Sequence, residues 1–118
     1  ITNTPLQAFV TLNDTTYVEA ARVLAEGILT SGGDTFEDQL IFAWRRALAR
    51  KPLPEEVKAM RSLYEVMHTQ YADDLEAATA LVSTGESPRD ETLDVSDHAA
   101  WTAVCNAILN LDETLTSE

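Results

Sequence analysis

The chain has 118 residues, of which 45% are hydrophobic, and a formal net charge of −12. A chain of this length is expected to form one domain with a substantial core. The charge argues against nucleic acid and anionic membranes as partners, because both would repel the protein. Membrane insertion is not expected either, since no apolar run approaches the length of a transmembrane helix.

The charged residues are unevenly distributed along the chain. Six of the eight basic residues lie between Arg45 and Arg61, whereas eleven acidic residues and a single basic one, Arg89, are found from Asp73 onward. Compensation of helix dipoles and solvated helix faces explain this pattern better than a dedicated docking patch does. Cys105 is the single cysteine, so neither an internal disulfide nor a cysteine-rich metal site can form.

The first fourteen residues predict a short helix with defined ends. Thr4 suits the N-cap, Pro5 the first helical position and Gln7 the third. This is a capping box with proline at a position where its missing N–H costs nothing. Asn13 is expected to end this helix, and Asp14 to cap the next one.

Two longer helices are expected to follow. Apolar residues recur with helical period from Tyr17 to Leu29. The Ser-Gly-Gly sequence at residues 31–33 ends this helix, because glycine readily adopts a left-handed backbone conformation. Asp34 is expected to cap the following helix, which carries a wide apolar stripe and ends before Pro52.

The second half of the chain continues the helical pattern. Pro54 begins a helix whose start is weak, because Leu53 is a poor N-cap. Asp73 or Asp74 is expected to begin a shorter helix. Residues 85–95 are rich in Gly, Pro, Ser and acidic residues and predict a long loop.

Ser96 or Asp97 is expected to cap the last long helix. Its inward-facing residues are predicted to be Trp101, Val104, Cys105, Ile108 and Leu109. No alternation with a period of two competes with these helical patterns. The sequence therefore predicts an all-α fold, a bundle of five to six helices that forms a single domain over residues 1–118.

Two short patterns resemble reactive sites but have simpler explanations. Glu65 and His68 have the Glu-x-x-His spacing of di-iron bundles. Such sites need two of these motifs and further inward glutamates, so a surface pair is expected here. Cys105 lies on an apolar helix face with no histidine placed to activate it, and we expect a buried, inert thiol.

A group of acidic residues near the last helix could gather around a hard cation such as calcium. The segment lacks the glycine and the terminal glutamate of an EF-hand loop, so a solvated acidic loop is the preferred interpretation. The residues concerned are Asp90, Asp94, Asp97 and His98.

No recognisable catalytic set is present, so enzymatic activity is uncertain, and neither a metal nor a cofactor is expected. Further polar residues gather at the two ends of the chain, and helix caps and termini explain most of them without any function. They form a candidate polar cluster of Asn3, Gln7, Asn13, Asp14, Asn110 and Asp112. We expect the first helix to pack near the end of the last one, which would bring these residues together.

Several motifs resemble a known family over nearly the whole chain. They are residues 2–8 (TNTPLQA), 12–14 (LND), 17–22 (YVEAAR), 43–45 (AWR) together with Leu48, Arg50 and Pro52, then 85–88 (GESP), 100–104 (AWTAV) and 109–115 (LNLDETL). In this order they are similar to the C-terminal part of a planctomycete secreted domain, also known as domain of unknown function 1553. The resemblance implies that the chain, which starts with isoleucine, is the C-terminal portion of a longer family domain.

The resemblance further implies a parent protein that is exported to the periplasm or cell surface. Family members often carry a second domain upstream and a cytochrome c-like domain, so any haem would belong to a module outside this chain. We expect a non-catalytic helical structural or interaction module, whose partners are other domains of the parent polypeptide or a protein complex. Two alternatives are an enzyme or ligand site completed by upstream sequence, and a subunit or fragment docked in a larger complex.

Overall fold

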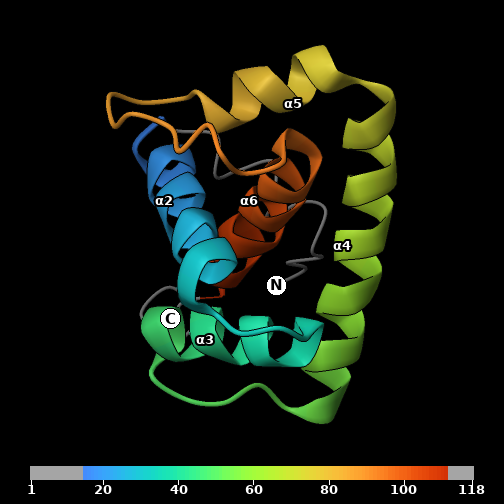
Figure 1. Ribbon diagram of the computed structural model, residues 1–118. Helices are drawn as coiled ribbons and strands as arrows, with labels where there is room; N and C mark the ends of the chain where they lie inside the picture. Colours follow the sequence, from blue (N-terminus) through green and yellow to red (C-terminus); the bar gives the residue numbers. More distant parts are fainter. Residues whose placement is uncertain (1–14, 112–118) are drawn as a thin grey trace.

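The computed structural model describes residues 15–111, and there it forms five α-helices and no strand (Figure 1). The helices are α2 (Thr15–Ser31), α3 (Phe36–Leu48), α4 (Pro54–Asp73), α5 (Leu75–Val82) and α6 (Val95–Asn110). The predicted all-α bundle is therefore confirmed. The short helix expected between Thr4 and Asn13 lies outside the described residues.

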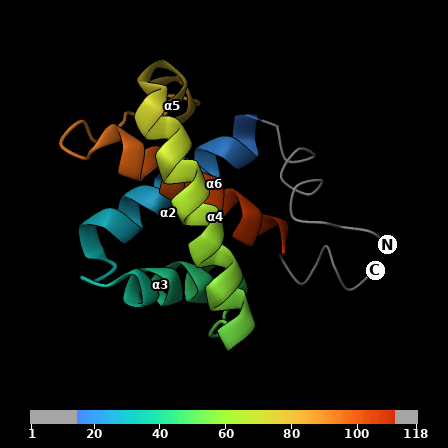
Figure 2. The same cartoon turned by 90° about the vertical axis from the view of Figure 1, so that its right-hand side faces the viewer.

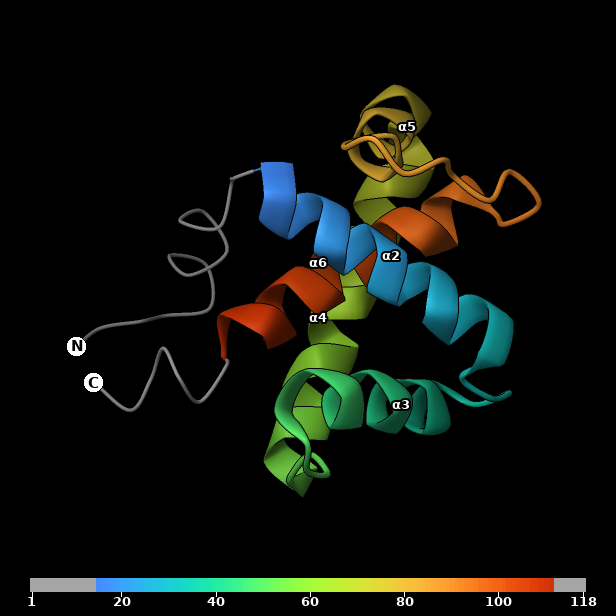
Figure 3. The same ribbon diagram turned by 90° about the vertical axis from the view of Figure 1, so that its left-hand side faces the viewer.

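Helix α6 forms the centre of the bundle, and the other four described helices all pack against it. Helices α2 and α4 lie on opposite sides of α6: Figure 2 shows α4 in front of it, and Figure 3 shows α2 in front of it from the other side. Every residue from His98 to Ile108 is buried. Between His98 and Ile108 helix α6 therefore has no solvated face, and its buried surface extends well beyond the stripe that the sequence predicts.

The main core lies between α2, α3, α4 and α6. It contains two almost completely buried tryptophans, Trp44 and Trp101. The ring of Phe36 stacks on that of Trp101 at 5.0 Å, and the ring of Tyr64 packs against both of them at 5.4 and 5.1 Å. Aromatic pairs in this range contribute beyond the area that they bury. They hold the start of α3 and the middle of α4 against α6.

Two of the predicted helix starts are wrong by one or more residues. Helix α3 is capped by Thr35 instead of Asp34, and the Thr35 hydroxyl accepts a hydrogen bond from the Asp38 amide at 3.1 Å. Helix α6 is capped by Asp94 and not by Ser96 or Asp97. In both places several neighbouring side chains are suitable N-caps, so their residue types alone do not select one of them.

Leu53 is the N-cap residue of α4 and makes no side-chain capping hydrogen bond, and the weak start expected for this helix stays a prediction. Glu56 compensates in part by accepting a hydrogen bond from the Leu53 amide at 2.7 Å. Arg50 holds the same carboxylate through two contacts of 3.0 and 3.1 Å. For α5 the structure selects Asp74 as the cap, whose carboxylate accepts from the Ala77 amide at 3.1 Å.

Candidate functional site

Arg22, in the middle of α2, is a fully buried charged residue. Its Nε donates to the carbonyl oxygen of Thr84 at 2.9 Å, and its Nη2 donates to that of Ser87 at 2.6 Å. Its Nη1 lies 3.2 Å from a carboxylate oxygen of Glu26. A buried guanidinium is tolerated only when it is paired and hydrogen-bonded, and these contacts meet that condition. They attach α2 to residues 83–94, which we call the α5–α6 loop.

Glu19, one turn before Arg22, binds the same part of the loop. Its Oε2 accepts hydrogen bonds from both the backbone amide and the hydroxyl of Ser87, at 2.8 and 2.6 Å. These two bonds lower the pKa of the Glu19 carboxyl below its usual value of 4.5. Ser87 is thus held through its carbonyl by Arg22 and through its amide and side chain by Glu19.

Glu26 extends this set of contacts by another turn of α2. Its Oε2 accepts a hydrogen bond from the Asp90 amide at 3.2 Å and also lies 3.7 Å from Nε2 of His98. Residues spaced three, four and seven apart share one side of a helix. Glu19, Arg22 and Glu26 therefore form a continuous strip along α2, which we call the α2 clamp.

His98 joins the clamp to the central helix. The imidazole is buried, and its Nε2 lies 3.1 Å from the backbone carbonyl oxygen of Arg22, so this nitrogen is the donor. Burial lowers the pKa of His98 below its usual value of 6.5. His98 is thus a neutral hydrogen-bond donor inside the bundle, which is a structural role.

Gly85 allows the α5–α6 loop to approach the clamp. Its φ is +95°, in the left-handed region that side chains rarely adopt. A β-carbon at this position would also collide with the side chain of Glu19. Both the backbone conformation and the close contact therefore require glycine here.

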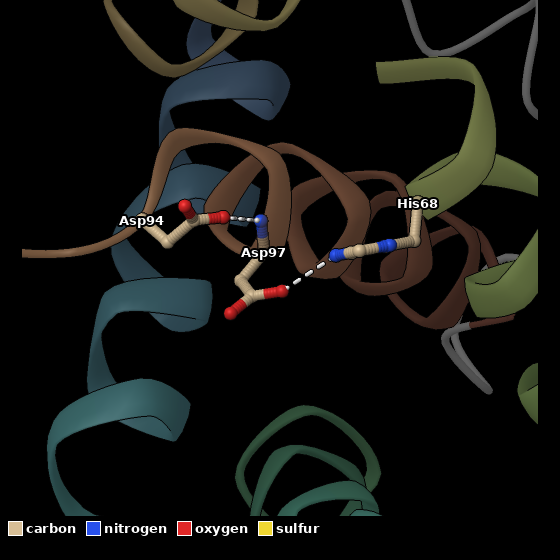
Figure 4. A group of neighbouring side chains, drawn as sticks. All are labelled: His68, Asp94 and Asp97. Carbon is tan, nitrogen blue, oxygen red and sulfur yellow. Dashed lines mark hydrogen bonds and ion pairs between the residues drawn. The ribbon is translucent and has the colours of Figure 1, made fainter. Parts of the chain in front are cut away.

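A second group of polar residues lies between the C-terminal half of α4 and the start of α6 (Figure 4). Nε2 of His68 lies 2.8 Å from Oδ1 of Asp97. The Tyr64 hydroxyl donates to the same oxygen at 3.3 Å, and Oδ2 of Asp94 accepts from the Asp97 amide at 3.0 Å. One potential ligand atom from each of His68, Asp94 and Asp97 lies within 4.8 Å of the others. We call these three residues the His68 cluster.

The structure separates the residues that the sequence grouped around a hard cation. Asp94 and Asp97 do lie together, but Asp90 turns back to bind the Thr92 hydroxyl at 2.6 Å, and His98 is buried against α2. Of the four residues that the sequence grouped, only Asp94 and Asp97 lie together, and the histidine beside them is His68 of α4. The expected surface position of His68 is confirmed, but its partner in the structure is Asp97.

Cys105 is buried in the main core, as predicted. Burial raises the pKa of its thiol, so the thiolate that nucleophilic chemistry needs is disfavoured. The prediction of an inert thiol agrees with this environment.

The candidate polar cluster at the chain ends remains a prediction. Asn110 is the last residue of α6 and is half-buried. The other members lie outside the described residues, as does the expected contact between the first helix and the end of α6. They are Asn3, Gln7, Asn13, Asp14 and Asp112.

Sequence reasoning missed the α2 clamp, although a signal for it was present. Glu19 and Arg22 belong to the motif at 17–22, and Ser87 belongs to the motif at 85–88. The two motifs are separated by 65 residues between Arg22 and Ser87, so only the fold shows that they bind each other.

Among the described residues no helix is both long enough and apolar enough to cross a membrane. Comparison with curated proteins and with solved structures yields no match. Comparison with family models matches residues 1–64, which is just over half of the chain, to PSD1, described as a protein of unknown function (DUF1553). This match contains Glu19 and Arg22, whereas Ser87 lies beyond it. The chain therefore belongs to the PSD1 (DUF1553) family of proteins of unknown function.

Proposed function

We propose that this chain is a non-catalytic helical module of a larger exported protein, in which it packs against or docks other domains. The observation that carries the proposal is the α2 clamp. The polar residues of two motifs, Glu19 and Arg22 in one and Ser87 in the other, bind one another within the bundle. Charged groups that bind other parts of the same chain stabilise the fold and are not available to bind a substrate.

The positions of the single cysteine and of one of the two histidines support the same conclusion. Cys105 and His98 are buried in the bundle, and neither faces a substrate-accessible surface. His98 already donates to a backbone carbonyl, and the pKa of Cys105 is raised by burial. A general base or nucleophile must reach the proton or the atom on which it acts. These two residues therefore support a structural role.

Three of the six basic residues between Arg45 and Arg61 contact aromatic or acidic side chains of the chain itself. Arg46 lies over the ring of Phe42 at 4.3 Å, and Arg61 lies over that of Phe36 at 4.6 Å. Arg50 pairs with a glutamate of α4. Cation–π contacts of this kind cover aromatic surface and stabilise it modestly. They favour solvated helix faces over a basic docking patch, so the proposed partners are protein domains instead of an anionic polymer.

The test measures two quantities separately: the stability of the chain, and its association with the rest of the parent polypeptide. The chain and the remainder of its parent polypeptide are produced separately, and their association is measured by calorimetry beside urea unfolding of the chain. For the clamp variant Ser87→Ala we expect a lower free energy of unfolding, with association retained wherever the variant is folded. Failure of the two parts to associate, for the native chain, would contradict the docking role.

The alternative of a ligand site completed by upstream sequence makes a different prediction. A small molecule that raises the unfolding temperature of the parent protein, and no longer does so after Asn110→Ala, would favour that alternative. The exported location is part of our proposal and rests on the family resemblance. Fractionation of cells that express the parent gene, with marker proteins for each compartment, tests it directly.

A further inference from the structure

The His68 cluster differs from an ordinary acidic surface patch because it contains an imidazole from a second helix. His68 lies on α4, and Asp97 lies 29 residues later in the first turn of α6. Imidazole nitrogen and carboxylate oxygen together are ligands for Zn²⁺ and related divalent ions, whereas Ca²⁺ prefers six to eight oxygens. The combination therefore favours a transition-metal ion of intermediate softness over calcium.

The distance between His68 and Asp97 is close to what such an ion requires, and Asp94 lies near enough to approach it by side-chain rotation. Potential ligand atoms of His68, Asp94 and Asp97 all lie within 4.8 Å of one another. Two ligands bound tetrahedrally to zinc at about 2.0–2.1 Å are about 3.3 Å apart. Nε2 of His68 and Oδ1 of Asp97 are 2.8 Å apart, so about 0.5 Å of opening would place an ion between them. Side-chain rotation supplies a movement of this size without moving either helix.

Tyr64 holds the two central ligands in position. Its hydroxyl donates to Oδ1 of Asp97 at 3.3 Å, and its ring stacks on the imidazole of His68 at 5.7 Å. The other side of Tyr64 packs against Phe36 and Trp101 in the main core. Burial raises the pKa of the Tyr64 hydroxyl, which keeps it protonated as a donor. Outer residues that orient ligands in this way are a regular part of metal sites.

We propose that His68, Asp94 and Asp97 bind one divalent transition-metal ion of the Zn²⁺ class, which joins α4 to the start of α6. The side chains of His68 and Asp97 are 39% and 40% exposed, so ions reach the site from solvent and water completes the coordination. The two carboxylates balance the charge of the ion. The proposal is independent of the non-catalytic role above, and it departs from the sequence-based expectation of no metal.

The test is titration of the metal-free chain with Zn²⁺ by calorimetry, and with Co²⁺ by absorption spectroscopy. We expect one equivalent to bind and the unfolding temperature to rise with Zn²⁺ concentration. His68→Ala and Asp97→Asn each alter a ligand and should weaken Zn²⁺ binding by about tenfold or more. Tyr64→Phe removes the hydroxyl that orients Asp97 and should weaken it about tenfold. Asp94→Asn removes the ligand charge but keeps a good N-cap, so α6 still starts normally.

Glu65→Gln is the matched control. It removes one negative charge next to Tyr64, on an exposed position of α4, and leaves the cluster intact. Its affinity for Zn²⁺ should remain within about twofold of the native value, since only screened charge is lost. Circular dichroism of each metal-free variant confirms that it is folded. The proposal is overturned if the native chain shows no saturable uptake, or if His68→Ala and Asp97→Asn bind as tightly as Glu65→Gln.

Discussion

The Nη2 atom of Arg22 lies 2.6 Å from the carbonyl oxygen of Ser87, although the two residues are 65 positions apart in the chain. This short hydrogen bond connects the middle of α2 with the loop between α5 and α6. It is formed by a guanidinium that has no contact with solvent. Removing the charge should therefore affect the whole bundle and not only the loop.

Arg22→Met tests this relationship. Methionine fills much of the same space but leaves the carbonyls of Thr84 and Ser87 without their donor. We expect the free energy of unfolding to fall by about 2–4 kcal/mol, as is typical when one partner of a buried charged contact is removed. Urea unfolding measures this, and hydrogen exchange should show faster exchange of the loop amides. The exposed Arg45→Met is the control, and equal losses for both variants would contradict the role of the clamp.

Gly85→Ala tests the contact between the loop and Glu19. The substitution places a side chain at a φ of +95° and against the Glu19 carboxylate. We expect a loss of about 1–3 kcal/mol in the free energy of unfolding. Gly27→Ala is the matched control, because its β-carbon would lie at an ordinary 3.5 Å from Phe42 within α2. There alanine should stabilise the helix by about 0.5–1 kcal/mol, so the two variants should differ in sign.

Leu53→Ser should strengthen the start of α4. Leu53 has the extended backbone of an N-cap, and its side chain is 52% exposed, so serine loses little buried surface and gains an acceptor. We expect about 1 kcal/mol of additional stability in thermal or urea unfolding. Leu53→Ala has no acceptor and should show no such gain. If serine and alanine behaved alike at this position, the cap would not be limiting.

Stability should depend on pH through His98. Burial lowers its pKa in the folded state, so below about pH 6.5 the unfolded chain binds a proton that the folded chain does not. The free energy of unfolding is therefore highest above that pH and falls as the pH drops toward the lowered pKa. The charged groups that interact electrostatically with the imidazole include Glu26, Arg89, Arg22 and Asp90. Urea unfolding across this range measures the slope.

His98→Gln should flatten this pH dependence, because the titrating group is gone. The chain has only one other histidine, so His68→Gln is the natural control. The control should retain the slope that His98 causes. A slope that persists in His98→Gln would show that another group is responsible.

Local sequence patterns predict the helices well and their packing poorly. The period of apolar residues from Tyr17 to Leu29 marks α2, and Gly33, with φ of +110°, follows its end as expected. Helix α3 ends at Leu48, and its C-cap Ala49 has a left-handed conformation that could not be predicted from the sequence, because alanine rarely adopts it. Helix starts are also misjudged where several side chains could cap, as at Asp34 and Thr35.

The burial of α6 on all sides could not be predicted from its apolar stripe. Four alanines share one side of the helix, next to that apolar stripe, and their small side chains give a neighbouring helix room to approach, so they are a further signal of burial. They are Ala99, Ala100, Ala103 and Ala107. The two polar groups considered above were missed for a related reason. Arg22 meets Ser87, and His68 meets Asp97, only because helices far apart in the sequence pack on α6.

The position of α6 at the centre of the bundle also sets the order in which the protein can be assembled. Helices α2 to α5 leave the ribosome before the helix on which all of them pack. A nascent chain that ends at residue 94 therefore carries four helices whose apolar sides have no common surface to cover them. The core can form only after α6 has been synthesised. The contacts between α6 and α2 then join residues from the two ends of the described sequence. Synthesis proceeds from the periphery of this bundle to its centre, and before α6 emerges the net negative charge of the chain acts against association.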